Sequence, residues 1–196
     1  MNIKKGISCV AFGFLFTLVN INLTLNGFTV NVMPDFIGYL LLFLAFGQFG
    51  SYAEGREFLK WCFLLLAVVT AGVWGSSILR PELAMPAWLT TAVAAVSACA
   101  MFLLFGIIEK IAGDFNSPQE QTVGWLKYVN VILYAAFFFT SVNLGRDIAS
   151  GAHEAGSAFQ TYLGVLASVM GAAALVFAVI TAFVLFKLKK DIEMRA

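Results

Sequence analysis

The sequence predicts an all-α membrane protein: a bundle of six transmembrane helices, with both termini inside and a short extracytoplasmic β-hairpin between the first two helices. Three observations lead to this prediction. The 196 residues are 61% hydrophobic and 12% charged, whereas a soluble domain has about 45–50% apolar and about 25% charged residues. Long apolar runs alternate with short polar segments, and most positive charges fall in every second polar segment.

Six apolar runs approach the roughly 20 residues that a helix needs to cross a bilayer. They cover residues 6–21, 35–52, 59–79, 86–108, 124–145 and 160–186. The first two are short, and a short span is accommodated by tilt or by local thinning of the bilayer. Because no internal repeat is visible, we expect a single integral membrane domain over residues 1–196.

A β-hairpin is predicted over residues 21–32, which read I-N-L-T-L-N-G-F-T-V-N-V. Apolar and polar residues alternate on both sides of Asn26-Gly27, a pair that favours a two-residue turn. The resulting pairs are Leu25 with Phe28, Thr24 with Thr29, Leu23 with Val30, Asn22 with Asn31 and Ile21 with Val32. One face of the hairpin is then apolar, and the other carries only Asn and Thr.

The second helix is expected to start at Pro34 and Asp35. Pro34 suits the first turn of a helix, where its missing N–H has no intrahelical partner. Asp35 beside it lies near the positive end of the helix dipole. Pro86 has the same place at the start of the fourth helix.

The placement of positive charge predicts the orientation. With the N-terminus inside, the inner segments hold ten Lys and Arg residues and the outer segments hold two, Arg80 and Arg146. The inner ten are Lys4, Lys5, Arg56, Lys60, Lys110, Lys127, Lys187, Lys189, Lys190 and Arg195. Because such a bias marks the cytoplasmic side, we expect both termini in the cytoplasm and the hairpin outside.

Polar residues at the outer ends of the helices form a candidate ligand site. They are Asn22, Thr24 and Asn31 of the hairpin, Asp35 and Tyr39 of the second helix, and Asn143 and Arg146 near the end of the fifth. Two interpretations remain open. In one, Asp35 caps its helix and pairs with Arg146 or Arg80. In the other, these residues line an outward-facing pocket, since ionisable residues at membrane depth commonly mark a functional site.

Asn130 and Tyr134 lie four residues apart, so they share one face of the fifth helix. Asn130 is the most interior strongly polar residue of that helix. We expect it to form a hydrogen bond to another helix, of about 0.6–2 kcal/mol.

The search for catalytic motifs finds none. Cys9, Cys62 and Cys99 fall within apolar runs and lack metal-ligand spacing, and His153 is the single histidine. No Ser-His-Asp set, Gly-rich phosphate loop or HExxH motif occurs, and no basic patch with interleaved aromatic residues is present. We therefore expect no enzyme activity, no metal or cofactor site and no nucleic-acid partner.

The P-D-F-I-G-Y stretch at residues 34–39 resembles a motif of small multi-pass bacterial membrane proteins of unassigned function, where it opens the second helix. This resemblance implies a bacterial plasma membrane protein. The layout is also similar to that of the substrate-binding S components of energy-coupling-factor vitamin transporters, which are six-helix proteins with an outward-facing pocket. Their first helix carries small residues spaced for docking a membrane partner subunit, a pattern that Cys9 and Gly13 approach.

The leading functional prediction is a small-molecule-binding integral membrane protein, a substrate-binding subunit of a transporter with a pocket beneath the hairpin. The alternative is a non-catalytic structural or interaction protein whose outer hairpin docks a partner chain. A closed cavity between the hairpin and the outer ends of the second and fifth helices distinguishes the first from the second.

Overall fold

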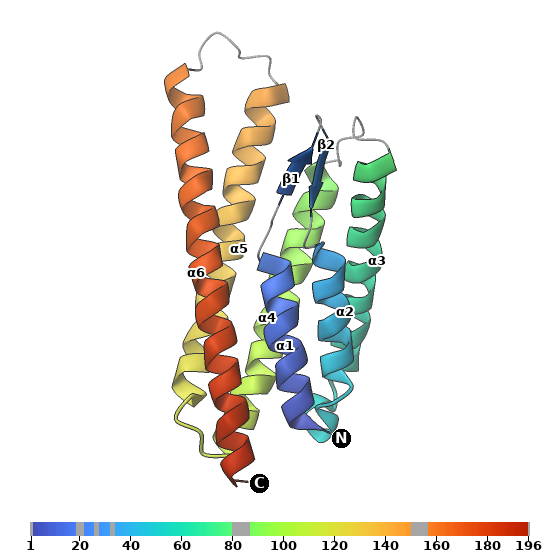
Figure 1. The fold of residues 1–196 in the computed structure, drawn as a ribbon, viewed down its shortest axis with the longest axis vertical. Helices are drawn as coiled ribbons and strands as arrows, with labels where there is room; N and C mark the ends of the chain where they lie inside the picture. Colours follow the sequence, from blue (N-terminus) through green and yellow to red (C-terminus); the bar gives the residue numbers. More distant parts are fainter. Residues whose placement is uncertain are drawn as a thin grey trace.

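The computed structural model describes residues 2–18, 22–25, 28–31, 34–79, 87–149 and 157–195, with side chains described at 2–18, 34–76, 78–79, 88–136, 165 and 168–195. The elements in order are α1 (Ile3–Leu18), β1 (Asn22–Leu25), β2 (Phe28–Asn31), α2 (Asp35–Phe46), the 3₁₀ helix η1 (Gly50–Ala53), α3 (Glu57–Leu79), α4 (Ala87–Asp114), α5 (Glu120–Ala149) and α6 (Ser157–Arg195). The two ends of the chain lie at the same end of the bundle (Figure 1).

Three helices are long and apolar enough to cross a membrane, which makes the chain a membrane protein by length and composition. These segments are Glu57–Ser76 in α3, Trp88–Asp114 in α4 and Ser168–Arg195 in α6. The prediction of a six-span bundle is therefore wrong, because the described part of the chain contains three such segments. The fifth expected span, 124–145, lies in α5, whose side chains are described only as far as residue 136.

The first two helices are too short for the spans expected of them. α1 has 16 residues and α2 has 12, which correspond to about 24 Å and about 18 Å of helix against a hydrocarbon core of about 30 Å. α2 ends at Phe46 because the chain leaves the helix at Gly47 and turns at Gly50, whose φ of 55° suits glycine. The expected span 35–52 ran past this stop, which the two glycines mark in the sequence.

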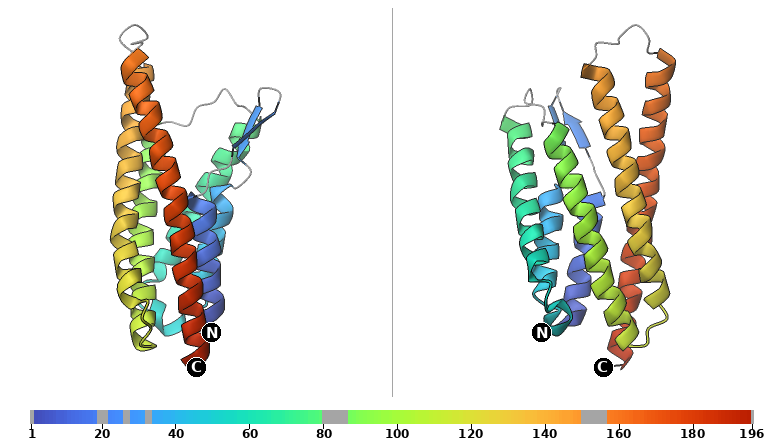
Figure 2. Two further views of the ribbon diagram at one scale, coloured as in Figure 1. Left: turned by 60° about the vertical axis from the view of Figure 1, so that its left-hand side comes forward. Right: turned by 180° about the vertical axis from the view of Figure 1, so that it is seen from behind.

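An aromatic contact at the centre of the bundle joins three helices. The ring of Phe14 in α1 packs edge to face against Phe105 of α4 at 5.4 Å and against Phe177 of α6 at 5.7 Å between ring centroids. All three side chains are buried, and such edge-to-face pairs add to the stabilisation that burial supplies. Farther from the termini, α5 and α6 diverge from α3 and the strands (Figure 2).

The backbones of α1 and α2 lie in close contact at Gly13 and Gly38. A Cβ atom added at Gly38 would lie 2.7 Å from the Gly13 carbonyl oxygen and 2.6 Å from Cγ2 of Thr17. Small residues permit such backbone contact between membrane helices. Tyr39 directly follows Gly38 and Asp35 lies three residues before it, so both belong to the part of α2 that this contact holds against α1.

The two strands form an antiparallel sheet at the end of the bundle away from the termini (Figure 1). The pairs are Asn22 with Asn31, Leu23 with Val30, Thr24 with Thr29 and Leu25 with Phe28. This register is the one predicted for these eight residues. Ile21, Val32, Asn26 and Gly27 lie outside the described residues, and so do the side chains of both strands, on which the predicted apolar face depends.

The end of α6 is bonded to the turn between α4 and α5. The hydroxyl of Ser117 donates a hydrogen bond to Oδ2 of Asp191 at 2.7 Å, and both residues are buried. Nη1 of Arg195 donates to the carbonyl oxygens of Phe115 at 2.9 Å and Asn116 at 2.7 Å. A cation is favourable there, because the carbonyls at a helix C-terminus carry the negative end of the dipole.

Candidate functional site

Polar side chains from α2, α4 and α5 meet inside the bundle, and we call Asp35, Tyr39, Ser97 and Tyr134 the polar cluster. The hydroxyl oxygens of Tyr39 in α2 and Ser97 in α4 share a hydrogen bond of 2.7 Å. Tyr39 is 4% exposed and Ser97 is 0% exposed. The bond therefore links two helices through groups that solvent does not reach.

Tyr134 and Asp35 have hydrogen-bonding capacity that the protein does not use. The Tyr134 hydroxyl lies close enough to that of Tyr39 to interact with it and is within electrostatic range of the Asp35 carboxyl, but its distance and angles do not make a well-formed hydrogen bond. Oδ1 of Asp35 is also buried without a partner. A tyrosine hydroxyl can donate and accept, and a carboxylate can accept, so the polar cluster can form additional hydrogen bonds.

The structure at the start of α2 shows that Asp35 is not the N-cap residue of the helix. The N-cap residue is Pro34, which has an extended backbone and no side-chain capping bond, and the helix begins at Asp35 itself. The helix dipole still favours a carboxylate in this first turn. The expected pairing of Asp35 with Arg80 or Arg146 involves side chains outside the described residues.

Two more buried polar side chains lack hydrogen bonds. Asn130 in α5 and Thr181 in α6 are 0% exposed, and Oδ1 and Nδ2 of Asn130 and Oγ1 of Thr181 have no partner. The predicted interhelical hydrogen bond of Asn130 is therefore wrong. Each buried polar group without a hydrogen bond costs about 1–3 kcal/mol, so these residues reduce the stability of the folded protein.

Two of the seven predicted site residues have described side chains, and both of these, Asp35 and Tyr39, belong to the polar cluster. The other five are placed by their backbone alone, in β1, β2 and α5. Their side chains lie outside the described residues; they are Asn22, Thr24, Asn31, Asn143 and Arg146. The structure thus brings Asp35 and Tyr39 together and does not place the side chains of the rest.

Ser97 and Thr181 were missed by sequence reasoning. Ser97 lies in the Ala-rich stretch 92–100, where a serine is easily taken for a small packing residue. Thr181 lies within an apolar run, and a lone threonine there carries no pattern. Only the partner, Tyr39, shows that Ser97 contributes to a polar site.

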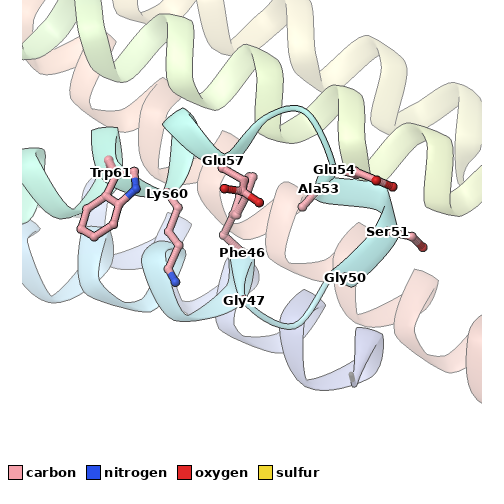
Figure 3. Close-up of a pocket in the computed structure, with 9 residues that line it drawn as sticks. All are labelled: Phe46, Gly47, Gly50, Ser51, Ala53, Glu54, Glu57, Lys60 and Trp61. Carbon is pink, nitrogen blue, oxygen red and sulfur yellow. The ribbon is translucent and has the colours of Figure 1, made fainter.

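Two open cavities lie near the end of the molecule that carries the termini. The first, of about 520 Å³, lies at the turn between α2 and α3 (Figure 3). It is lined by Phe46, Gly47, Gly50, Ser51, Ala53, Glu54, Glu57, Lys60 and Trp61. The second, of about 510 Å³, is formed by α1, α2 and α6. Apart from Asp35 and Tyr39, the residues expected to line the predicted pocket beneath the hairpin have side chains outside the described residues.

Comparison with known proteins adds no relative: no family model, curated protein or solved structure matches this chain. What the polar cluster can bind must therefore be inferred from its own functional groups. These groups are one carboxyl and three hydroxyls, and they bind by hydrogen bonding and by the charge of Asp35.

Proposed function

We propose that this protein binds a small polar molecule within the membrane, at the polar cluster, and that it is a substrate-binding subunit of a transporter. The observation that supports the proposal is the unused hydrogen-bonding capacity of two buried atoms on different helices, Oδ1 of Asp35 and the hydroxyl oxygen of Tyr134. Lipid offers such groups no partner. A ligand between α2 and α5 would satisfy both.

The groups of the polar cluster favour a ligand that carries an N–H or O–H donor. The carboxylate of Asp35 would accept this donor, and an amine would gain most from its negative charge. The Tyr134 hydroxyl would bind an acceptor or a second donor on the same ligand. Tyr39 and Ser97, which already bond to each other, would hold the helices at the required separation.

We also propose that the protein lies in the bacterial plasma membrane, with both termini in the cytoplasm and the strands outside. Ten of the twelve Lys and Arg residues lie toward the helix ends at which both termini are found, and this bias of positive charge supports the orientation. Asp35 begins α2 at the end nearer the strands. A ligand would then enter from the outer side.

Thermal unfolding of the protein in lipid nanodiscs tests the proposal. Amino acids, amines, polyols and vitamins are screened, because a compound that binds the folded state raises Tm by mass action. Tyr134→Phe removes one cluster hydroxyl and should reduce the ligand-induced rise in Tm, as should Asp35→Asn. The matched control is Tyr128→Phe, which removes a hydroxyl from a residue of α5 that is 54% exposed and should leave the rise unchanged.

Access of water to the cluster provides a second measurement that does not depend on the compounds screened. The variant Asp35→Cys, at a half-buried member of the polar cluster at the start of α2, is made in a chain whose Cys9, Cys62 and Cys99 are replaced by Ala. A membrane-impermeant maleimide added from the outer side should label it, since ligand entry requires an aqueous path. Absence of labelling, or an equal Tm rise in Tyr134→Phe and wild type, would contradict the proposal and favour the structural or interaction role.

A further inference from the structure

The cavity of about 510 Å³ formed by α1, α2 and α6 combines positive charge with apolar surface. Lys4 and Lys5 near the start of α1 and Lys189 near the end of α6 line it together with one acidic residue, Glu193. The remaining lining residues are Asn2, Ser8, Cys9, Phe12 and Leu41. The cavity thus carries three potential cations against one anion.

The three lysines have no carboxylate partner in the described part of the chain. The ion pair found there is Lys127 with Glu109, at 2.7 Å. An excess of one sign of charge in a concave site attracts ions of the other sign. The cavity is therefore suited to an anionic group.

The apolar wall lies farther along α1 than the lysines. Phe12 is eight residues after Lys4, or about 12 Å along the helix at 1.5 Å per residue. Its side chain is 49% exposed, and its ring packs against Phe186 of α6 at 5.5 Å between centroids. Leu41 of α2 is half-buried and completes the wall. Charge is thus followed by apolar surface along the axis of the bundle.

We propose that this cavity binds one anionic phospholipid. The headgroup phosphate would lie among Lys4, Lys5 and Lys189, and an acyl chain would lie along Phe12 and Leu41. Basic pockets between membrane helices are suited to anionic headgroups. A free phosphate would use the lysines but not the apolar wall, so a lipid fits the whole cavity better. Because α1 and α6 both contribute, the lipid would join the first and last helices.

Native mass spectrometry of the purified full chain in detergent, titrated with phosphatidylglycerol, tests this site. The cavity variant replaces Lys4, Lys5 and Lys189 by Gln. The matched control removes the same charge from exposed lysines at the same end that do not line the cavity: Lys110, Lys187 and Lys190, each replaced by Gln. A lysine near an anionic headgroup is worth about fivefold in affinity, so the cavity variant should bind roughly 100-fold more weakly.

Further binding measurements distinguish a bound lipid from a bound free anion. Phosphatidylcholine should bind the wild type weakly, sn-glycerol 1-phosphate should not displace phosphatidylglycerol, and Phe12→Ala should weaken phosphatidylglycerol binding. If the triple variant does not fold, Lys189→Gln alone should still show a loss of about fivefold. Equal losses in the cavity and control variants, or displacement by glycerol phosphate at the same concentration as lipid, would overturn the proposal.

Discussion

Asn130 has a fully buried amide that forms no hydrogen bond at either of its polar atoms. It lies one turn from Tyr134 on α5, whose hydroxyl is also without a partner. The sequence predicts that both residues lie on one helical face, because residues four positions apart are neighbours on a helix. It could not reveal the absence of partners, because partners come from other helices whose rotation the sequence does not determine.

Asn130→Leu should therefore raise Tm. The substitution removes an unpaired amide and keeps a side chain of similar size, and removal of such a penalty is worth about 1–3 kcal/mol. For a chain of this length, at about 2–4 °C per kcal/mol, we expect a rise of roughly 2–12 °C. Thermal unfolding in nanodiscs measures it, with Ile132→Leu as the control because Ile132 is 66% exposed on the same helix. A fall in Tm would show that the Asn130 amide forms a stabilising hydrogen bond within the folded protein and would contradict this prediction.

Among the elements, α1 and α2 show what the sequence could and could not predict. The strand register followed from the alternation around Asn26-Gly27, since that pattern is local. The end of α2 at Phe46 was missed because the apolar run was extended to residue 52, although Gly47 and Gly50 directly after Phe46 are residues that commonly end a helix. The contact between Gly13 and Gly38 is likewise non-local, and glycine alone does not reveal which neighbour it approaches.

Gly38→Ala should destabilise the α1–α2 pair. Its Cβ would lie 2.7 Å from the Gly13 oxygen and 2.6 Å from Cγ2 of Thr17, so the two backbones must separate. Overpacking of this kind costs about 1–3 kcal/mol, and Tm should fall accordingly. Gly72→Ala in α3 is the matched control, because a Cβ there meets no atom within 4 Å. Equal Tm values for the two variants would show that α1 and α2 are not held together at this contact.

For the whole molecule, the sequence indicated a membrane protein correctly and overestimated the number of spans. Composition reports the average environment, whereas a span also requires enough consecutive helical residues, which α1 and α2 lack. The two termini lie at one end of the bundle (Figure 1). The side of the membrane that this end faces remains a prediction from the charge bias.

Cysteine labelling in intact cells should show the orientation. In a chain whose native cysteines are replaced by Ala, Asn26→Cys at the expected hairpin turn should react with a membrane-impermeant maleimide. Ser51→Cys in the exposed part of η1 should react only after the cells are permeabilised, because the charge bias places that end inside. Labelling of Ser51→Cys in intact cells, with Asn26→Cys protected, would reverse the proposed orientation.

The bonds between α6 and the α4–α5 turn have a consequence for the order in which the protein assembles during synthesis. Asp191 and Arg195, the partners of that turn, are translated more than 70 residues after it, since the bonds of Ser117 and Asn116 span 74 and 79 positions. Until the ribosome has delivered the end of α6, the hydroxyl of Ser117 and the carbonyl of Asn116 lack these partners. The bonds that fix the turn between α4 and α5 therefore form late in synthesis. In a nascent chain stalled before residue 191, we expect this turn to be cleaved by proteases more readily than in the complete chain.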